Sequence, residues 1–370
     1  MNTNSVFEIP LLAKVSLFLI GFYVFVLMLS VGQGIIVPLI FGTIIAMVLH
    51  PIVRFFVRKK MNRILAIVIT LLLSFTLIIA FGLFFYSQVS RFGESWPLLV
   101  EKITSLLNET IQWVPGYFDI SADEVNSWLA DTKNKLLDSS SSVIGQTLIS
   151  AGNAMIAIFL VPVYIFMILY YQPLLLEFIQ RLFGGNKRNN VGVIVSQTKS
   201  VVQRYLVGLF IETILVALLN SVGLLILGID YAILIGVLGA LLNLIPYIGG
   251  LIAVAMPMMI ALVTKDSPWF ALYVMAVYYF IQLIDNSYIV PKIVASKVKI
   301  NALVSIVSVL AGGALWGVAG MFLSIPITAI IKVICDHVEP LKPVGFLLGD
   351  TMPEIAIFKI RSIKTKKNPR

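Results

Sequence analysis

Long hydrophobic segments separated by short polar ones make up most of the chain. Several reach the roughly 20 residues that a helix needs to cross about 30 Å of hydrocarbon. Because these segments are continuously apolar and do not alternate, they predict helices rather than the strands of an outer-membrane barrel. The predicted crossings are residues 11–31, 35–49, 64–86, 148–171, 205–227 and 269–283.

Two further hydrophobic segments, 231–263 and 301–333, are too long for one crossing, since a straight helix over the first would measure roughly 50 Å. The first is broken at residues 243–250 (NLIPYIGG) and the second at Gly312-Gly313, with Gly317 behind them. Proline removes a backbone donor, and glycine pairs admit dihedrals that other residues avoid. Each half is then too short to span, which favours a re-entrant hairpin over two crossings or one kinked helix. The predicted fold class is an all-α integral membrane protein with about six transmembrane crossings and two re-entrant helical hairpins, and the alternative is eight crossings.

The basic residues predict which ends of these helices face the cytoplasm. Residues 54–63 carry several Arg and Lys and no acidic residue, and residues 177–204 are also predominantly basic. Cytoplasmic loops retain Lys and Arg, so both segments and both chain termini are expected in the cytoplasm, in a multi-pass protein of the inner (plasma) membrane. If residues 231–263 form a re-entrant hairpin, Lys292, Lys297 and Lys299 are cytoplasmic too.

The same pattern divides the chain into five regions. In residues 90–147 acidic residues outnumber basic ones, which predicts an extracytoplasmic region. It contains an amphipathic helix that lies on the membrane surface or against neighbouring subunits, or else is covered by its own loop. The other regions are the first three spans (1–89), spans four and five with a basic loop (148–230), a hairpin and transport core (231–340) and a basic cytoplasmic tail (341–370).

Composition excludes several functional classes. Hydrophobic residues make up 59% of the chain and charged ones 12%, against about 25% charged in a soluble domain. The net charge of +9 follows from basic cytoplasmic loops, so no nucleic-acid partner is expected. Cys335 is the single cysteine, and no Cys/His pairs with zinc spacing, no Walker A motif and no Ser/His or paired intramembrane Asp residues are found. We therefore expect no metal, no cofactor and no enzymatic activity.

Three motifs of the C-terminal half resemble those of a known family. They are NLIPYIGG (243–250), Asp285-Asn286 followed by Pro291, and GALWGVAGMFLSIP (313–326), in that order. Together they resemble the signatures of the autoinducer-2 exporter (AI-2E) family of transporters. The resemblance implies a homopentamer in which two helical hairpins contact the substrate and an elevator-type movement carries it. Members of this family are described both as autoinducer-2 exporters and as sodium/proton antiporters, and the resemblance does not choose between them.

The broken hairpins supply the main candidates for substrate binding. Backbone groups freed at broken helices are tolerated at membrane depth where they line a cavity or are buried in protein. The alternative is that the glycines allow close helix packing, as small residues commonly do in membranes. The candidates are Asn243, Pro246, Gly249 and Gly250 on the first hairpin, and Gly312, Gly313 and Gly317 on the second.

Polar residues inside the apolar segments supply the remaining candidates. Glu212 lies within the fifth span, where it either carries a coupling proton or is paired with Arg204. Gln282 and Asn286 have the (i, i+4) spacing that puts both amides on one helical face. Asp285 beside them either binds a cation or caps the next turn.

These expectations define a secondary transporter that exports a small polar metabolite or signal such as autoinducer-2. The alternatives are a sodium/proton (cation/proton) antiporter, and an oligomeric channel or structural membrane protein. The expected partners are a small polar solute, protons or sodium, membrane lipids, and other copies of the chain.

Overall fold

The computed structural model describes residues 10–112, 159–181, 188–244, 248–265, 267–294 and 299–351. Within these ranges the regular structure is helical, apart from one isolated bridge between Ile300 and Gly349. The predicted all-α class is therefore confirmed.

Six of the described helices are long and apolar enough to cross a membrane. Their bounds are α1 Leu11–Val31, α2 Gln33–Arg58, α3 Arg63–Gln112, the helix Phe159–Arg181, α5 Arg188–Ile226 and α9 Ala302–His337. Shorter elements are α6 Ala232–Asn243, α7 Ile248–Thr264, α8 Trp269–Ile284, the π-helix η1 Asp285–Val294, the 3₁₀ turn η3 Glu339–Leu341 and α10 Lys342–Leu348. The predicted crossing 269–283 corresponds to α8, which has only 16 residues and is not among the six span-length helices. The sixth helix of that length is α9, which was predicted as a hairpin.

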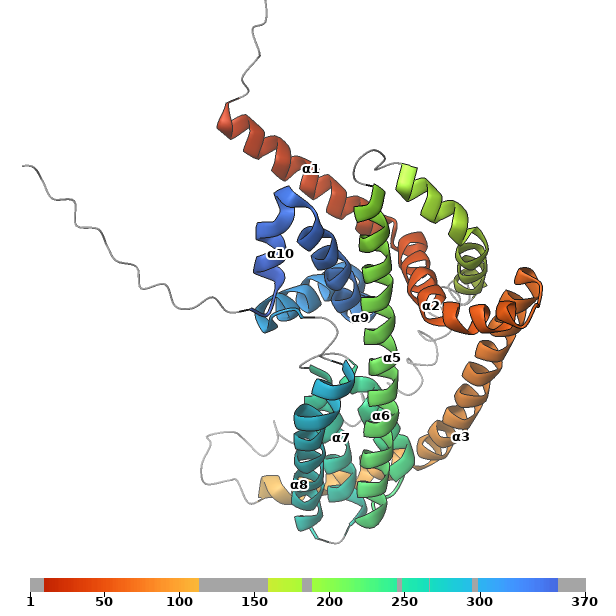
Figure 1. The fold of residues 1–370 in the computed structure, drawn as a ribbon. Helices are drawn as coiled ribbons and strands as arrows, with labels where there is room; N and C mark the ends of the chain where they lie inside the picture. The colour runs from red at the N-terminus through yellow and green to blue at the C-terminus, as the bar shows by residue number, and fades with distance from the viewer. Residues whose placement is uncertain are drawn as a thin grey trace, which may run out of the picture.

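The central element is α5, which runs along most of the molecule (Figure 1). Helices α6, α7 and α8 gather beside its C-terminal half, while α2 and α9 lie beside its N-terminal half. Leu224, Ile235 and Val274 belong to a buried cluster in the first group, and Ile44, Val202 and Leu323 to a cluster in the second. Lipid tails are as apolar as these side chains, so close packing and polar contacts hold such helices together.

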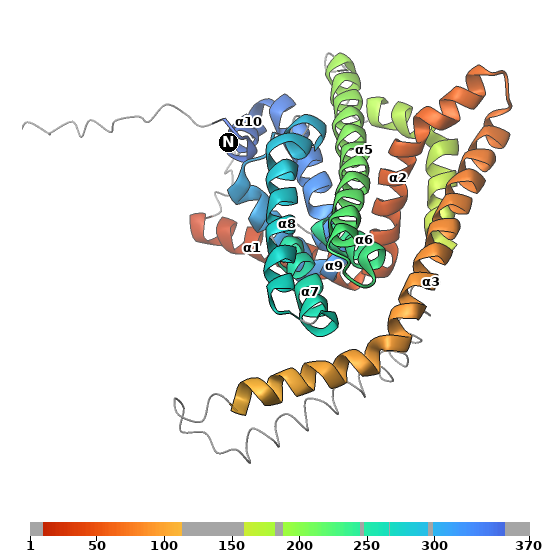
Figure 2. The ribbon, with the colours of Figure 1, turned by 90° about the horizontal axis from the view of Figure 1, so that it is seen from below.

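Helix α3 is much longer than the predicted span, because its polar part stays helical, even through Pro97. It continues through residue 90 into the region expected outside the membrane. Figure 2 shows that its C-terminal part turns and passes beside α7. Phe92 meets Tyr231 edge to face at 5.3 Å, and Phe92 and Ile103 face Met256 and Ile260 of α7 across an apolar groove.

The break between α6 and α7 falls within the predicted NLIPYIGG segment, and the two helices fold against each other. A Cβ atom on Gly249 would collide with the carbonyl of Leu242, so only glycine allows the chain to return this closely. A Cβ on Gly236 would similarly collide with Ser221. The missing side chain at Gly236 therefore allows α6 to lie close to α5. Both glycines therefore have the packing role that was the alternative to ligand binding.

Helix α9 also folds back on itself. Trp316 and Gly317 leave helical geometry, with Gly317 at φ +60°. The hydroxyls of Ser308 and Thr328 then lie 3.0 Å apart, and a Cβ on Gly312 would collide with the carbonyl of Gly320. The sequence placed this break at Gly312-Gly313, which is wrong by about one helical turn. Gly312 stays helical and provides close contact between the arms, while Gly317 supplies the positive φ.

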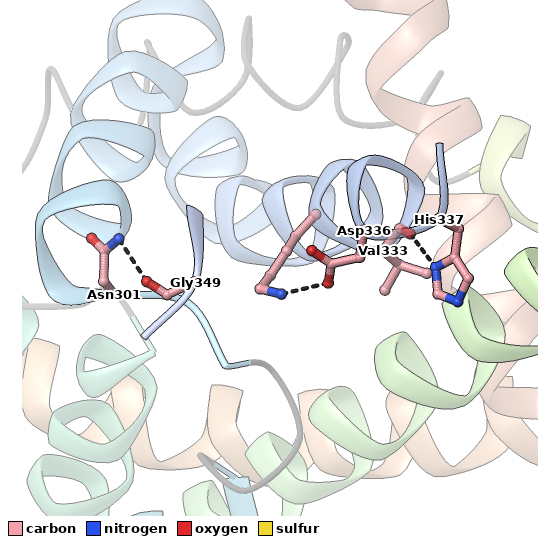
Figure 3. Close-up of polar contacts among 6 residues, drawn as sticks. Asn301, Val333, Asp336, His337 and Gly349 are labelled. Carbon is pink, nitrogen blue, oxygen red and sulfur yellow. Dashed lines mark hydrogen bonds and ion pairs between the residues drawn. The ribbon is translucent and has the colours of Figure 1, made fainter. Parts of the chain in front are cut away.

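The segment after α9 is tied back to the start of that helix. Asn301 caps α9 by accepting a hydrogen bond from the Val304 amide, and its Nδ2 donates to the carbonyls of Leu347 and Gly349 (Figure 3). At the far end of α9, Lys332 pairs with Asp336 and the His337 ring bonds the Val333 carbonyl (Figure 3). The hydrogen bonds of Asn301 fix the end of α10 beside α9, whereas those of Lys332 and His337 lie within α9.

Helix α1 has no buried residue, and most of its large apolar side chains are exposed. Its C-terminal end contacts the bend of α9, where Trp316 Nε1 donates to the Leu29 carbonyl at 3.0 Å. A predominantly apolar, exposed helix requires a lipid or protein environment, which agrees with a membrane-spanning role.

Candidate functional site

Polar side chains converge where α5, α6, α7 and α8 meet, in an otherwise apolar part of the bundle. They surround a cavity of about 10 Å³, which is close to the space that one water molecule needs. In this conformation the cavity is therefore closed to a larger solute. The lining residues are Val216, Asn220, Gly239, Asn243, Gly250, Ala253, Tyr278, Ile281, Gln282 and Asp285.

Asp285 is the charged residue of this cluster, and its side chain is 2% exposed. Its Oδ2 accepts a hydrogen bond from Asn243 Nδ2 at 3.4 Å, across 42 positions of the sequence. Its Oδ1 is buried without a hydrogen-bond partner in the described part of the chain. Asp285 directly follows α8 and begins η1, and in the described residues its side chain accepts no hydrogen bond from a backbone amide, so it does not cap the next turn. A π-helical turn is frequently found at functional sites.

Amide and hydroxyl groups complete the cluster. Gln282 Nε2 lies 3.5 Å from Asn286 Oδ1, so the two amides share one face as their spacing predicted, although Asn286 itself is exposed. Asn220 and the hydroxyl of Tyr278 approach Gly239, which offers no side chain there. The Tyr278 hydroxyl is buried without a partner among the described residues. The cluster thus holds more donors and acceptors than its internal hydrogen bonds use.

Glu212 lies on α5 near this cluster and is 8% exposed. Gly208 lies one turn before Glu212 on the same face of α5. A Cβ on Gly208 would collide with the carbonyl of Ile293 in η1, so this face of α5 packs against η1. Glu212 and Asp285 are close enough to interact electrostatically. In the described residues Glu212 makes no ion pair with Arg204, and its Oε2 has no hydrogen-bond partner. The pairing that was the alternative role for Glu212 is therefore not formed.

The structure brings together Asn243, Gly250, Gln282 and Asp285 of the sequence candidates. Gly249 lies next to them but packs against Leu242. Pro246 lies outside the described residues. The remaining candidates, Gly312, Gly313 and Gly317, lie on α9 and line no part of this cavity.

Two residues of the cluster were not selected as candidates from the sequence. They are Asn220 and Tyr278, which both line the cavity. The signal for Tyr278 was its spacing, because it precedes Gln282 by four residues and Asp285 by seven on the same helix face.

Chemically, this site can hold a small polar molecule or a cation or proton. Its lining presents one carboxylate, three amides and a phenol, a set that hydrogen-bonds hydroxyl or carbonyl groups, and the carboxylate of Glu212 is buried nearby. Within the described residues, no group of three or more His, Cys, Asp or Glu residues could hold a metal ion. A buried polar site beside a broken helical hairpin, within a bundle of long apolar helices, defines a multi-pass membrane protein of the transporter class.

The chain belongs to the AI-2E transporter family, whose model matches residues 12–339. It is 26% identical over 322 residues to the AI-2 transport protein TqsA of Escherichia coli strain K12, covering 86% of this chain and 91% of that protein. It is 25% identical over 309 residues to the putative transport protein YueF of Bacillus subtilis strain 168, covering 80% and 82% of the two chains. The putative transport protein YrrI of the same organism is 24% identical over 319 residues, with 82% and 87% covered.

Proposed function

We propose that this chain is a secondary transporter that exports a small polar metabolite or signal, such as autoinducer-2, through the site around Asn243 and Asp285. The observation that carries the proposal is the partly buried hydrogen bond between these two side chains. It joins the broken end of α6 to the junction of α8 and η1, so the site is assembled by the hairpin itself. The similarity to the AI-2 transport protein TqsA supports the solute class.

The solute replaces the contacts that the cluster now makes with itself. Asn243, Gln282 and Asn220 offer amides, Tyr278 a hydroxyl and Asp285 a carboxylate. A solute rich in hydroxyl groups can satisfy all of these, whereas an apolar one leaves them buried and unpaired at a cost of about 1–3 kcal/mol each. Selection for polar solutes follows from this difference.

The cavity opens when the helices around it move. In the elevator-type movement that the family resemblance implies, the hairpin α6–α7 travels with α8 and η1 against a scaffold formed by the other spans. Both broken segments, α6–α7 and the folded α9, act as re-entrant hairpins, in a homopentamer of the plasma membrane with cytoplasmic termini. The contact of the α6–α7 hairpin with α5 through small residues at Gly236 and Ser221 suits a sliding surface.

A transport assay in liposomes tests the proposal. Purified protein is reconstituted with autoinducer-2 inside, and efflux is measured with imposed proton or sodium gradients. We expect efflux above that of empty liposomes, and a loss of about tenfold or more in Asn243→Ala and Asp285→Asn, since hydrogen bonds to charged groups contribute about 1.5–3 kcal/mol. The matched control is Ser287→Ala, two positions after Asp285 on the exposed side of η1. Equal efflux in all variants would exclude this site.

A second candidate function is sodium/proton antiport, which one observation favours. Glu212 and Asp285 each bury a carboxylate oxygen that has no partner in the described residues, and oxygen atoms are the ligands that hard cations prefer. In that case sodium added to proteoliposomes without any organic solute moves protons. The Asp285→Asn variant then abolishes this sodium/proton exchange. If the protein instead exports the solute and sodium moves no protons, the result supports the first proposal.

A further inference from the structure

A much larger cavity lies beside the N-terminal half of α5, away from the polar site. Its volume is about 840 Å³, in the upper part of the roughly 300–1,000 Å³ range of ligand pockets. It is bounded by α2, the helix Phe159–Arg181, α5 and the segment from the end of α9 to η3. Most of the surface is aliphatic, with Ala46, Leu169, Leu176, Val195 and Ile334 among the lining residues.

A cluster of basic side chains marks one end of this cavity. Lys199 Nζ lies 2.8 Å from His50 Nδ1, and since an ammonium can only donate, the imidazole nitrogen accepts. Arg54 and Arg63 are close enough to His50 to act on it electrostatically. Arg63 also donates to the carbonyl of Leu169 in the cavity wall, at 2.6 Å. Three cationic groups therefore surround one neutral histidine.

The carboxylates near the cavity do not compensate this charge, because each has a cation of its own. Asp336 pairs with Lys332, Glu339 with Lys342, and Glu177 with Arg181. In the described residues neither Lys199, Arg54 nor Arg63 makes an ion pair with a carboxylate. Among the residues that the structure describes, this basic end has no negatively charged partner, and no side chain fills the aliphatic part of the cavity.

We propose that this cavity binds an anionic phospholipid of the adjacent membrane leaflet. The phosphate lies against Lys199, Arg54 and Arg63, and the acyl chains fill the aliphatic part between α2, the helix Phe159–Arg181 and α5. Basic pockets between membrane helices on the cytoplasmic side are suited to such headgroups, and residues 54–63 are the segment expected there. A free phosphate or a nucleotide would leave the aliphatic wall uncovered.

The lipid also gives the cavity a structural role. It fills the space between α2 and α5 at the end of the molecule where α9 contacts both helices. Bound lipid is therefore expected to stabilise the protein against heat, because a ligand that binds only the folded state raises apparent stability.

The test measures lipid binding to the full chain in detergent by native mass spectrometry and by thermal unfolding. The probes are phosphatidylglycerol, phosphatidylcholine with the same acyl chains, and glycerol phosphate. We expect phosphatidylglycerol to bind and to raise the unfolding temperature, with little effect from the other two. The double variant Arg54→Gln with Lys199→Gln is expected to bind it on the order of 30-fold more weakly, from the contribution of each basic group near a lipid surface.

Two further variants make the result decisive. Arg58→Gln removes an exposed basic residue of the same segment and is expected to keep wild-type binding. Lys199→Arg keeps the charge and is expected to retain it too, which separates loss of binding from loss of folding. Equal binding of the two phospholipids, equal stabilisation by glycerol phosphate, or equal loss in Arg58→Gln would each overturn the proposal. Absence of lipid on a folded oligomer, as when a neighbouring subunit fills the cavity, would overturn it as well.

Discussion

The side-chain hydroxyls of Ser308 and Thr328 lie 3.0 Å apart although 20 positions separate them in the sequence. In a continuous helix these residues would be about 30 Å apart. The contact therefore defines α9 as two arms that pack face to face, with the turn at Trp316 and Gly317. The N-terminal arm, residues 302–315, is too short to cross a bilayer alone.

The contact predicts a cross-link between the two arms. In a Cys335→Ser background, the pair Ser308→Cys and Thr328→Cys is expected to form a disulfide with a mild oxidant, because the replaced oxygen atoms are in hydrogen-bond contact. The measurement is a protease cut between the arms followed by gel electrophoresis with and without reductant. The control pair is Leu310→Cys with Thr328→Cys, since Leu310 is 59% exposed and faces away. Equal cross-linking of both pairs would mean that α9 does not fold as described.

Gly317 predicts a second effect, on stability. Its φ of +60° with ψ of −142° is a backbone conformation that residues other than glycine rarely adopt. Gly317→Ala is expected to destabilise the protein by about 1–3 kcal/mol, seen as a lower unfolding temperature in detergent. Gly82→Ala is the control, because Gly82 lies within α3 with no atom within 4 Å of an added Cβ. There alanine is expected to be neutral or stabilising by up to about 1 kcal/mol. Equal unfolding temperatures for the two variants would contradict the backbone conformation described for Gly317.

The sequence predicted the helical class and the position of the first break, because length, hydropathy and the Pro-Gly segment act locally. It placed the second break wrongly, since Gly312 and Gly317 look alike in sequence and only the packing of Gly312 on Gly320 distinguishes them. The helix ends were also wrong for α3 and α5, because their polar extensions stay helical and the helix of α3 continues even through Pro97.

The candidate site was predicted in part, for a similar reason. Asn243, Gln282 and Asp285 were selected because polar residues in apolar segments are costly. Tyr278 and Asn220 join them only because α8 and α5 pack against α6 at Gly239, which no local pattern reveals. The separation of the α9 glycines from this cavity likewise depends on tertiary contacts.

The topology gives a third prediction, about Lys292. This residue is exposed in η1, after the α6–α7 hairpin and α8. If the hairpin re-enters the bilayer, Lys292→Cys in a Cys335→Ser background is expected to be cytoplasmic. A membrane-impermeant thiol reagent should then label it in inverted vesicles and not in intact cells. Arg58→Cys serves as the cytoplasmic reference. Labelling of Lys292→Cys from outside the cell would require α6–α7 to act as a single crossing.

Glu212 gives the last prediction, which concerns coupling. Its carboxylate is buried on α5, close to Asp285 and without an ion pair to Arg204 in the described residues. Two buried carboxylates near each other repel when both are charged, so one of them is expected to take up a proton when the site is empty of cations. Glu212→Gln keeps the shape but cannot exchange that proton.

In proteoliposomes the Glu212→Gln variant is therefore expected to lose acceleration of transport by an imposed pH gradient while still assembling as the wild type does. Glu212→Asp should retain part of the response, because it keeps a titratable group on a shorter side chain. The matched control is Glu177→Gln, which makes the same chemical change at a carboxylate that is exposed and paired with Arg181. An unchanged response to the pH gradient in Glu212→Gln would assign the coupling proton to Asp285 alone, because Asp285 is the other buried carboxylate in the described part of the bundle.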